Sequence, residues 1–472
     1  MQGHSSSEQR AFTRESIVTA LLFALLLLGL PLLLASSPKI FEDGDVSWHI
    51  ASGRWIIQHG RIPTTDPFSF TVAGRPWVAM EWLGDLIFAS AFTVASYRGL
   101  FLVVATALLA LNCILFLHLR RYVGAIGIAS ALVAMDVILG PFVMARPHVL
   151  VWPLLAGWTA LLAEAADTDR PPPLWSTLIL VAWTNTHGSF PLALPIATAA
   201  AFDSLWESKW RQWRAWGTFL VASAVALLLN ANGIAGIAQP FKIADLGMLP
   251  LIQEWQPSAP SVTPQFYGIL LLGLGVLLYK GVRVPPGRLV LLLLMLGLSF
   301  SHMRHQTWFA IVAATTIPPL FRTKPLAQFS VLPLGFALVP ALVLRMIWPV
   351  TPSESAPNPW HLIAAIPAPL RSQPVFNSYS FGGPLILSGI RPYIDGRAEI
   401  YGDAFVQNYA AIADGDWAKF NDAVKRYGIR WTVLPASDTR LIQELDSSPD
   451  WQRFYSGKAG VVYVRRNVRP AH

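Results

Sequence analysis

Long apolar runs dominate this sequence, and they decide the environment in which it can fold. There are about eleven of them, and a helix needs about 20 apolar residues to cross a bilayer core of about 30 Å. Only 13% of the residues are charged, against roughly a quarter in soluble proteins. A water-soluble enzyme and a disordered protein are therefore both excluded. The runs cover residues 17–34, 99–118, 124–144, 149–165, 174–188, 189–206, 215–230, 265–281, 288–302, 306–321 and 329–350.

The basic residues predict how these spans are oriented. Cytoplasmic loops carry an excess of Lys and Arg, and here alternate loops are basic while the opposite short loops hold only isolated basic residues. Arg10 and Arg14 precede the first run, so we expect a cytoplasmic N-terminus and an external C-terminus. An uncleaved first span is favoured, with a signal peptide cleaved near Ala35-Ser36-Ser37 as the alternative. The basic loops contain Arg120, Arg121, Arg170, Lys209, Arg211, Arg214, Lys280, Arg283, Arg288, Arg322 and Lys324.

Three parts are expected along the chain. Residues 1–350 form a transmembrane domain, whose long first outer loop, 36–98, holds interfacial helices. One of these is residues 81–96, since counting that short segment as a span would reverse the charge pattern. A proline-rich linker follows at 351–369 and then a small α/β domain at 370–472.

The C-terminal domain shows a mixture of strand and helix patterns. We expect a hairpin at its end, formed by Phe454–Tyr455 and Val461–Val464 around Ser456-Gly457. No Walker motif, Rossmann glycine motif or zinc-finger spacing is present, and the single cysteine, Cys113, excludes an internal disulfide. Further strands are predicted at 374–379, 384–388 and 431–434, and helices at 417–427 and 440–445.

The first outer loop opens with an acidic pair, Asp43 and Asp45. Asp45 begins an amphipathic pattern that runs to about Gly60 and has His49 one turn further along. Asp45 has two compatible interpretations: an N-cap that accepts the backbone N–H of Trp48, and a catalytic carboxylate held by a rigid helix start.

Other polar residues gather at the same outer face. Glu81 is interpreted either as a helix cap or as a second carboxylate, and Asp66 before Pro67 as an Asx-turn residue. Ionisable residues near spans tend to face a cavity, so their convergence predicts a shared aqueous cavity. The alternative is local: snorkelling or interfacial anchoring for the arginines and hydrogen bonds between helices for Asn185 and His187. The set is Arg146, His148, Asn185, His187, Asn230, Asn232, Glu254, Arg304 and His305.

Several sequence segments resemble one family. The run DGDVSWHIASGRWIIQHGRIPTTDPFSFT and the following GRPWVAMEWLGDLIFA resemble the GT-C class of polytopic glycosyltransferases. The similarity is greatest to poorly characterised bacterial members with a D-x-x-W-H-x-x-x-G-R opening. The segments ARPH, WTNTHGSF, LNANG, IQEWQP and SHMRHQ resemble the class too, as do Phe381-Gly382-Gly383 and Ile394-Asp395-Gly396-Arg397 in the outer domain.

The resemblance implies a fold and a reaction. The fold is an α-helical membrane protein of about 11 spans in the bacterial inner membrane, with a periplasmic α/β domain. The reaction is inverting transfer of a sugar from a polyprenyl-phosphate donor to a hydroxyl of a lipid, glycan or protein, with no nucleic-acid partner. We expect Asp45 as the base, Asp43 as its alternative and Glu81 as a second carboxylate. The implied substrate-binding residues are His49, Arg54, Arg146, His148, Asn185, His187, Glu254, Arg304 and His305.

Some questions stay open at this level. A cation must meet the charge that develops on the leaving phosphate: Arg304 is the first candidate, and a divalent Mg²⁺ or Mn²⁺ is the alternative. Asp395-Gly396-Arg397 is interpreted as a structural turn with a local ion pair. The competing functions are a transporter or flippase of a lipid-linked sugar, and a non-catalytic protein of glycan assembly.

Overall fold

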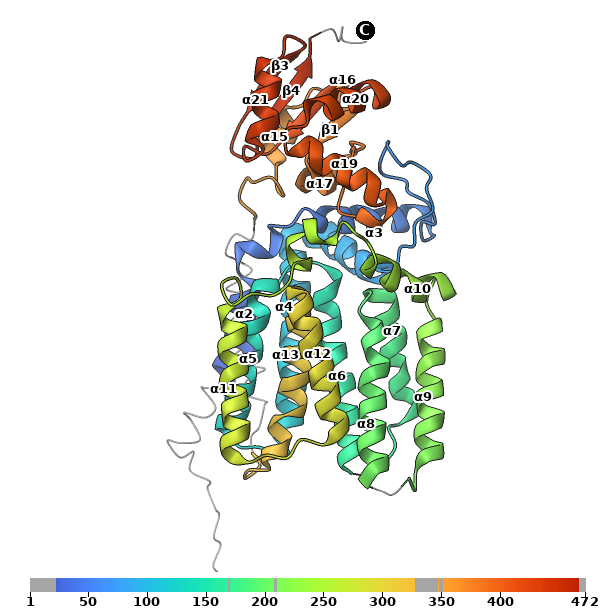
Figure 1. Cartoon of the computed structure of the whole chain (residues 1–472), viewed down its shortest axis with the longest axis vertical. Coiled ribbons are helices and arrows are strands. Elements are labelled where there is room, and N and C mark those ends of the chain that lie inside the picture. The colour runs from blue at the N-terminus through green and yellow to red at the C-terminus, as the bar shows by residue number, and fades with distance from the viewer. Residues whose placement is uncertain (1–22, 169, 208–209, 327–346, 348–350, 467–472) are drawn as a thin grey trace, which may run out of the picture.

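The computed structural model describes residues 23–168, 170–207, 210–326, 347 and 351–466. A bundle of roughly parallel and antiparallel helices forms one end of the molecule, and a smaller domain with a sheet stands on the other (Figure 1). Of the two outermost predicted spans, 17–34 is described from residue 23, and 329–350 lies outside the described residues apart from residue 347.

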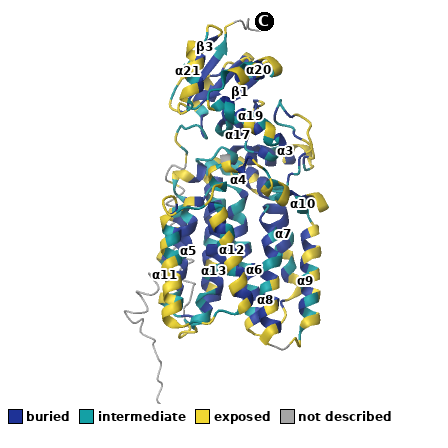
Figure 2. Cartoon of the chain, viewed as in Figure 1, coloured by how far each residue is buried: buried dark blue, intermediate teal, exposed yellow. Residues whose placement is uncertain are grey.

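The apolar runs form the helices of the bundle. Their outward faces carry exposed apolar side chains, as on α9, α11 and α12 (Figure 2), which suits a lipid environment. By length and composition, three helices can cross a membrane, Trp82–Leu119, Ala125–Phe142 and Pro147–Asp167, or four if the bent pair α9–α10 is one span. The number of about eleven spans therefore stays a prediction. The helices are α4 (Trp82–Leu119), α5 (Ala125–Leu139), α6 (Pro147–Asp167), α7 (Leu178–Thr186), α8 (Ala193–Glu207), α9 (Trp213–Leu228), α10 (Gly233–Ala244), α11 (Pro264–Lys280), α12 (Pro286–Ser301) and α13 (Gln306–Thr316), with the short α2 (Leu30–Ala35) before them.

The predicted basic loops meet at the end of the bundle opposite the sheet domain. Arg121 pairs there with Glu164, and Arg288 with Asp167. The Asp203 carboxylate accepts the backbone N–H of Gly287 at 2.6 Å and so holds the start of α12. The segregation of charge agrees with the predicted orientation, and which side of a membrane this end faces stays a prediction.

Two helices lie across the other end of the bundle. Helix α3 (Asp45–His59) ends at Gly60 in a left-handed conformation (φ 64°), as the amphipathic pattern predicts. The second is the first part of α4, which breaks at Ala95 and Ser96 (φ 52°) before the chain enters the bundle. This break confirms that residues 81–96 and 99–118 are separate helical segments. Helix α10 also lies across this end, at 89° to α9.

The sheet domain contains four strands in the order β1-β2-β4-β3. Strand β1 runs parallel to β2, and the terminal hairpin of β3 and β4 adds antiparallel strands. The predicted strands at 374–379 and 431–434, the hairpin and two helices are confirmed. The elements are β1 (Val375–Asn377), β2 (Trp431–Leu434), β3 (Trp451–Ser456), β4 (Val461–Arg465), α17 (Gly382–Leu387), α18 (Ala398–Tyr401), α19 (Asp403–Ala413), α20 (Trp417–Tyr427) and α21 (Thr439–Ser447).

One predicted strand, 384–388, is wrong, because these residues form most of helix α17. Pro384 has no N–H for a strand ladder, but in the first turn of a helix that N–H is not needed. Gly382 and Gly383 then allow close backbone approach. A Cβ on Gly382 would lie 2.5 Å from Ile394 O, and one on Gly383 would collide with Gly44 O. Helix α19 was not predicted.

The expected linker contains two short helices, α15 (Trp360–Ala365) and α16 (Ala368–Arg371). Leu362 and Ile363 on α15 are buried in one apolar cluster with Val433 and Val462 of the sheet. This part of the expected linker therefore packs onto the sheet, and the exact division into domains stays a proposal.

The first outer loop and the sheet domain share one hydrophobic core. Trp48 and Trp77 from the loop are buried in the same cluster as Phe376, Tyr393 and Ile400. The Thr71 hydroxyl also donates to the carbonyl of Tyr393 at 2.7 Å. The two segments, far apart in the sequence, therefore form one packed unit over the end of the bundle.

Candidate active site

A cavity of about 930 Å³ lies where the bundle, the first outer loop and the sheet domain meet. One part of its wall is apolar and comes from α10 and the ends of the bundle helices, including Phe241, Leu298 and Trp308. The charged part is lined by Asp43, Asp45, Glu81, Asp85, Arg146, Glu254, Arg304 and Glu399. Of the polar residues predicted to share a cavity, Arg146, His187, Glu254, Arg304 and His305 line this one, whereas His148, Asn185, Asn230 and Asn232 do not. The cavity has an apolar side and a polar side.

Arg146 is the centre of the charged part. Arg146 has the extended backbone that a residue before proline favours, and Pro147 is the first residue of α6. The Arg146 side chain therefore projects from the start of this helix. Its guanidinium nitrogens lie 3.0 Å from Asp43 Oδ2, 3.1 Å from Asp45 Oδ2 and 3.6 Å from Glu254 Oε1. One largely buried cation, whose side chain is 15% exposed, therefore joins the first outer loop to the 253–255 turn.

The two first-loop aspartates do different things. Asp43 Oδ1 accepts the backbone N–H of Asp45 at 2.8 Å, so Asp43 holds the turn that starts α3. Asp45 is the first residue of α3 and not its N-cap, which is Gly44, so the capping interpretation of Asp45 is wrong. Its side chain stays 16% exposed, towards the cavity. Burial raises the pKa of Asp45 to about 7, with Arg146 opposing and Asp43 adding to the rise.

Arg304 lies on the other side of Glu254. Its guanidinium is 2.9 Å from Glu254 Oε1 and stacks over the Trp255 ring at 4.6 Å. Burial raises the pKa of Glu254, but the Arg304 and Arg146 guanidiniums outweigh it and lower that pKa to about 2. Glu254 is therefore an anion between two cations.

Glu81 lies between two histidines. Glu81 Oε2 is 3.7 Å from His49 Nε2, and Glu81 Oε1 is 3.5 Å from His187 Nε2. His49 Nδ1 contacts Asp85 Oδ1 at 2.6 Å, and Ser52 donates to the other Asp85 oxygen at 2.6 Å. Burial raises the pKa of Glu81 and lowers the pKa of His49 to about 3, so His49 is neutral near pH 7. Glu81 occupies the position before α4 but makes no capping hydrogen bond.

The other predicted site residues lie either in the cavity wall or outside it. His305 lines the cavity and stacks on Trp308, with ring centroids 4.2 Å apart. His148 is not part of the cavity wall, and its Nε2 donates to the carbonyl of Phe142 at 2.9 Å. The Asn185 side-chain oxygen accepts hydrogen bonds from Trp82 Nε1 and the Ala231 N–H. Its amide nitrogen donates to the carbonyls of Val181 and Leu229, so Asn185 makes the predicted hydrogen bonds between helices. Arg54 stacks on Phe92 at 5.2 Å and is not part of the cavity wall.

Two groups of wall residues were missed by the sequence reasoning. Asp85 follows Glu81 by four residues, so a helical reading of this segment places both on one face. Tyr379 and Glu399 come from the sheet domain, which was expected to shape acceptor access, and no pattern in the sequence ties them to the first outer loop.

The carboxylates and histidines of the described site are not arranged as ligands of a divalent cation. Among the residues that the structure describes, no three His, Cys, Asp or Glu side chains are grouped as metal ligands. Asp43 and Asp45, whose carboxylate oxygens are of the ligand type that Mg²⁺ and Mn²⁺ prefer, both pair with the Arg146 guanidinium. His302 and His305 face the Trp255 ring, at 5.3 and 6.0 Å, and show no third ligand. We therefore derive no step through a metal.

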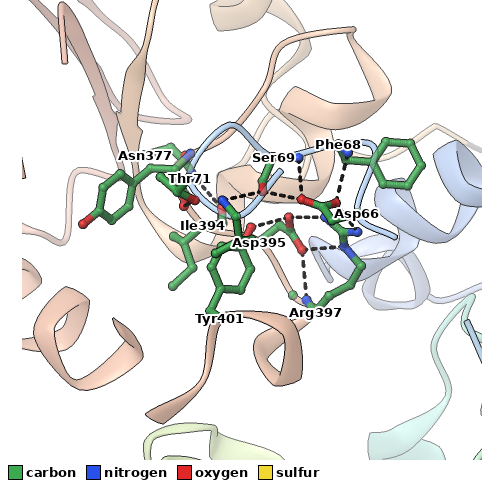
Figure 3. Close-up of polar contacts among 12 residues, drawn as sticks. Asp66, Phe68, Ser69, Thr71, Asn377, Ile394, Asp395, Arg397 and Tyr401 are labelled. Carbon is green, nitrogen blue, oxygen red and sulfur yellow. Dashed lines mark hydrogen bonds and ion pairs between the residues drawn. The ribbon is translucent and has the colours of Figure 1, made fainter. Parts of the chain in front are cut away.

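A buried ion-pair cluster, Asp66, Asp395 and Arg397, fixes the sheet domain to the first outer loop (Figure 3). Arg397 makes two bonds to Asp395, at 2.9 and 2.7 Å, and one of 2.7 Å to Asp66, with all solvent excluded from Arg397 and Asp66. Asp66 also accepts the N–H groups of Phe68 and Ser69, which confirms the Asx-turn prediction. The predicted local ion pair of Asp395 and Arg397 is confirmed as well.

No family model and no curated protein sequence matches the chain. Several solved structures are similar over most of it, among them the following two. ArnT from Cupriavidus metallidurans bound to undecaprenyl phosphate is 11% identical, with a TM-score of 0.51, over 93% of this chain and 97% of ArnT. The oligosaccharyltransferase of Archaeoglobus fulgidus in the apo form is 10% identical, with a TM-score of 0.53, over 97% of this chain and 75% of its own. Both are GT-C glycosyltransferases, and at these identities the similarity concerns the fold: this chain has the GT-C fold that its sequence resemblance implied.

Proposed function

We propose that this chain transfers a sugar from a polyprenyl-phosphate donor to a hydroxyl acceptor at the outer face of a bacterial inner membrane, with inversion. The observation that carries the proposal is the cavity wall, where Asp45, Arg146, Glu254 and Arg304 stand together beside an apolar side. This arrangement offers a base, cations for a phosphate and a surface for a prenyl chain. ArnT, which shares the fold, was solved with undecaprenyl phosphate bound.

Asp45 is the base in this proposal. It takes the proton of the acceptor hydroxyl while the acceptor oxygen bonds to the anomeric carbon. Asp43 is the weaker candidate, because one of its oxygens holds the Asp45 N–H and the other holds Arg146. Glu81, next to two neutral imidazoles, is suited to hydrogen-bonding a sugar or acceptor hydroxyl.

Arg304 and Arg146 hold the donor phosphate. When the bond between the anomeric carbon and the phosphate oxygen breaks, its electron pair stays on that oxygen, and the guanidiniums balance the added charge. Glu254 Oε1 lies 3.6 Å from Arg146 and 2.9 Å from Arg304, so a phosphate that binds these cations competes with Glu254. The Phe241, Leu298 and Trp308 side of the cavity accommodates the prenyl chain.

The test is deletion of the gene in its host, followed by mass spectrometry of lipid-linked sugars and surface glycans. We expect the loss of one sugar from a glycan and accumulation of its polyprenyl-phosphate donor, both reversed by the parent gene. A transporter predicts donor trapped on the inner leaflet and no in vitro transfer by the purified protein. An assembly protein predicts glycan loss that the Asp45→Asn and Arg304→Gln proteins repair in full.

The pH dependence of transfer follows from the pKa of Asp45. Because burial raises that pKa to about 7, the neutral carboxyl, which accepts no proton, predominates below pH 7. We expect the rate to rise with pH and to level off above about pH 7, as measured with purified protein between pH 5 and pH 9. A rate that is flat between pH 5 and pH 8 would contradict Asp45 as the base.

Replacing Arg304 should weaken binding of the donor phosphate. A charge-assisted hydrogen bond contributes about 1.5–3 kcal/mol, so Arg304→Gln should weaken binding of undecaprenyl phosphate by about 10- to 150-fold. Native mass spectrometry in detergent measures this, with Arg54→Gln as the control, since Arg54 lies outside the cavity wall. Equal affinities for the two variants would remove Arg304 from the phosphate site.

A further inference from the structure

The loop that carries Gly396 is held at both ends. Its neighbours Asp395 and Arg397 belong to the buried cluster in Figure 3, where Tyr401 adds a bond of 2.7 Å to Asp395. The Gly396 carbonyl accepts the hydroxyl of Tyr379 at 3.0 Å. The Gly396 backbone therefore has little freedom to move.

This fixed backbone lies directly against Asp45. A Cβ built on Gly396 would collide with Asp45 Oδ1 and would lie 2.7 Å from Asp45 Cγ and 2.8 Å from Trp48 Nε1, closer than real Cβ contacts. Gly396 does not have a positive φ, so the conformation itself does not demand glycine. Position 396 demands glycine because a Cβ there would collide with Asp45.

Further glycines allow close backbone contact between the start of α3 and the sheet domain. A Cβ on Gly383 would collide with the carbonyl of Gly44, and one on Gly44 would lie 2.5 Å from the carbonyl of Ser380. Glycines on both sides thus bring the start of α3, with Asp45, into backbone contact with the sheet domain.

We propose that Gly396 is a positioning residue, which forms the wall that holds the Asp45 carboxylate against Arg146. The two oxygens of Asp45 have opposite neighbours: Oδ2 is 3.1 Å from Arg146, and Oδ1 faces Gly396. A methyl group at position 396 must turn or shift the carboxylate, and either movement alters the contact with Arg146. The sheet domain therefore completes the catalytic site, and this inference rests on the proposed role of Asp45.

The first experiment compares turnover and donor binding for Gly396→Ala. We expect transfer to fall by at least about 100-fold, as for loss of a general base. The protein should still bind undecaprenyl phosphate within about threefold of the parent (a change below about 0.7 kcal/mol), because Arg304 is unchanged and Arg146 keeps its contacts with Asp43 and Glu254. A parent-like rate for Gly396→Ala would overturn the proposal. So would a loss of phosphate binding as large as that of transfer, which would indicate a general collapse of the cavity.

The second experiment needs no activity and covers the case in which Gly396→Ala folds poorly. We expect Gly396→Ala to lower the apparent melting temperature, and Asp45→Ala in the same chain to restore most of that loss by removing the colliding carboxylate. Gly382→Ala is the matched control, because its Cβ would meet the backbone of Asp395 and Ile394 and not Asp45. Asp45→Ala should leave its destabilisation unchanged.

The two experiments separate the possible failures. If Asp45→Ala suppresses neither variant, Gly396 does not act through Asp45 and the inference is wrong. If the suppression is specific to Gly396→Ala but the parent protein transfers no sugar, the contact is real and the proposed function is the part that fails.

Discussion

Asp45→Asn should reduce sugar transfer by about 10²–10⁴-fold, the usual contribution of a general base, while the protein still folds. The amide keeps the shape of the side chain and can still accept a hydrogen bond from Arg146, 3.1 Å away, but it cannot take a proton from the acceptor. Burial already disfavours the charged form of Asp45, so replacing its carboxyl with a neutral amide should change the free energy of unfolding little. The rate is measured with purified protein, and the glycan profile in the deleted host at matched membrane levels.

Asp43→Asn is the matched comparison for this prediction. It removes one of the carboxylates on Arg146 and weakens the acceptor for the Asp45 N–H, so we expect a smaller loss of rate and a lower melting temperature. A full glycan profile with Asp45→Asn would show that Asp45 is not the base. A loss confined to Asp43→Asn or to Glu81→Gln would then identify the carboxylate that is.

Arg397→Met should destabilise the sheet domain by about 3–5 kcal/mol, because it leaves two buried carboxylates, Asp66 and Asp395, without their cation. The guanidinium also packs against Phe68 and Trp77, at 5.0 and 4.8 Å, so its loss opens the core that the loop and the sheet domain share. Limited proteolysis and the melting temperature in detergent measure the effect.

Arg453→Met is the control for this second prediction. Arg453 belongs to the same domain and pairs with Asp446, but both side chains are more than two-fifths exposed, and surface ion pairs contribute little. The prediction fails if the two variants melt at the same temperature. Rescue of Arg397→Met by the further change Asp66→Asn, which removes one unpaired charge, would confirm the cause.

The sequence predicts those features that depend on local patterns. Apolar runs and basic loops predict the bundle helices, the break before residue 99 and the charged end, since bilayer thickness and loop charge act on short segments. The helix from Asp45 to His59 and strand β2 were predicted with nearly the observed bounds. Arg146, Glu254 and Arg304 were predicted to share a cavity because each stands at a span end on the same face.

The failures concern long-range contacts. The segment 384–388 has a strand-like composition, but glycine-mediated contact with Gly44 and residues 394–395 selects a helix there. One of the two interpretations of Asp45, the helix cap, is wrong, because Gly44 takes that position and the Asp45 carboxylate pairs with Arg146, 101 residues further along the chain. The approach of Gly396 to Asp45 spans most of the chain, and no local pattern records it.

The shared core of the first loop and the sheet domain also sets the order in which the protein can be made. Thr71 and Tyr393, which are bonded in that core, are 322 residues apart. At about 5–20 residues per second, the ribosome takes roughly 16 to 64 seconds to bridge that distance. The loop leaves the ribosome first, and its Trp48 and Trp77 stay uncovered until the sheet domain has been synthesised. Because Gly396 and Arg397 are synthesised only then, the proposed reaction centre can form only after the helices of the bundle have been synthesised.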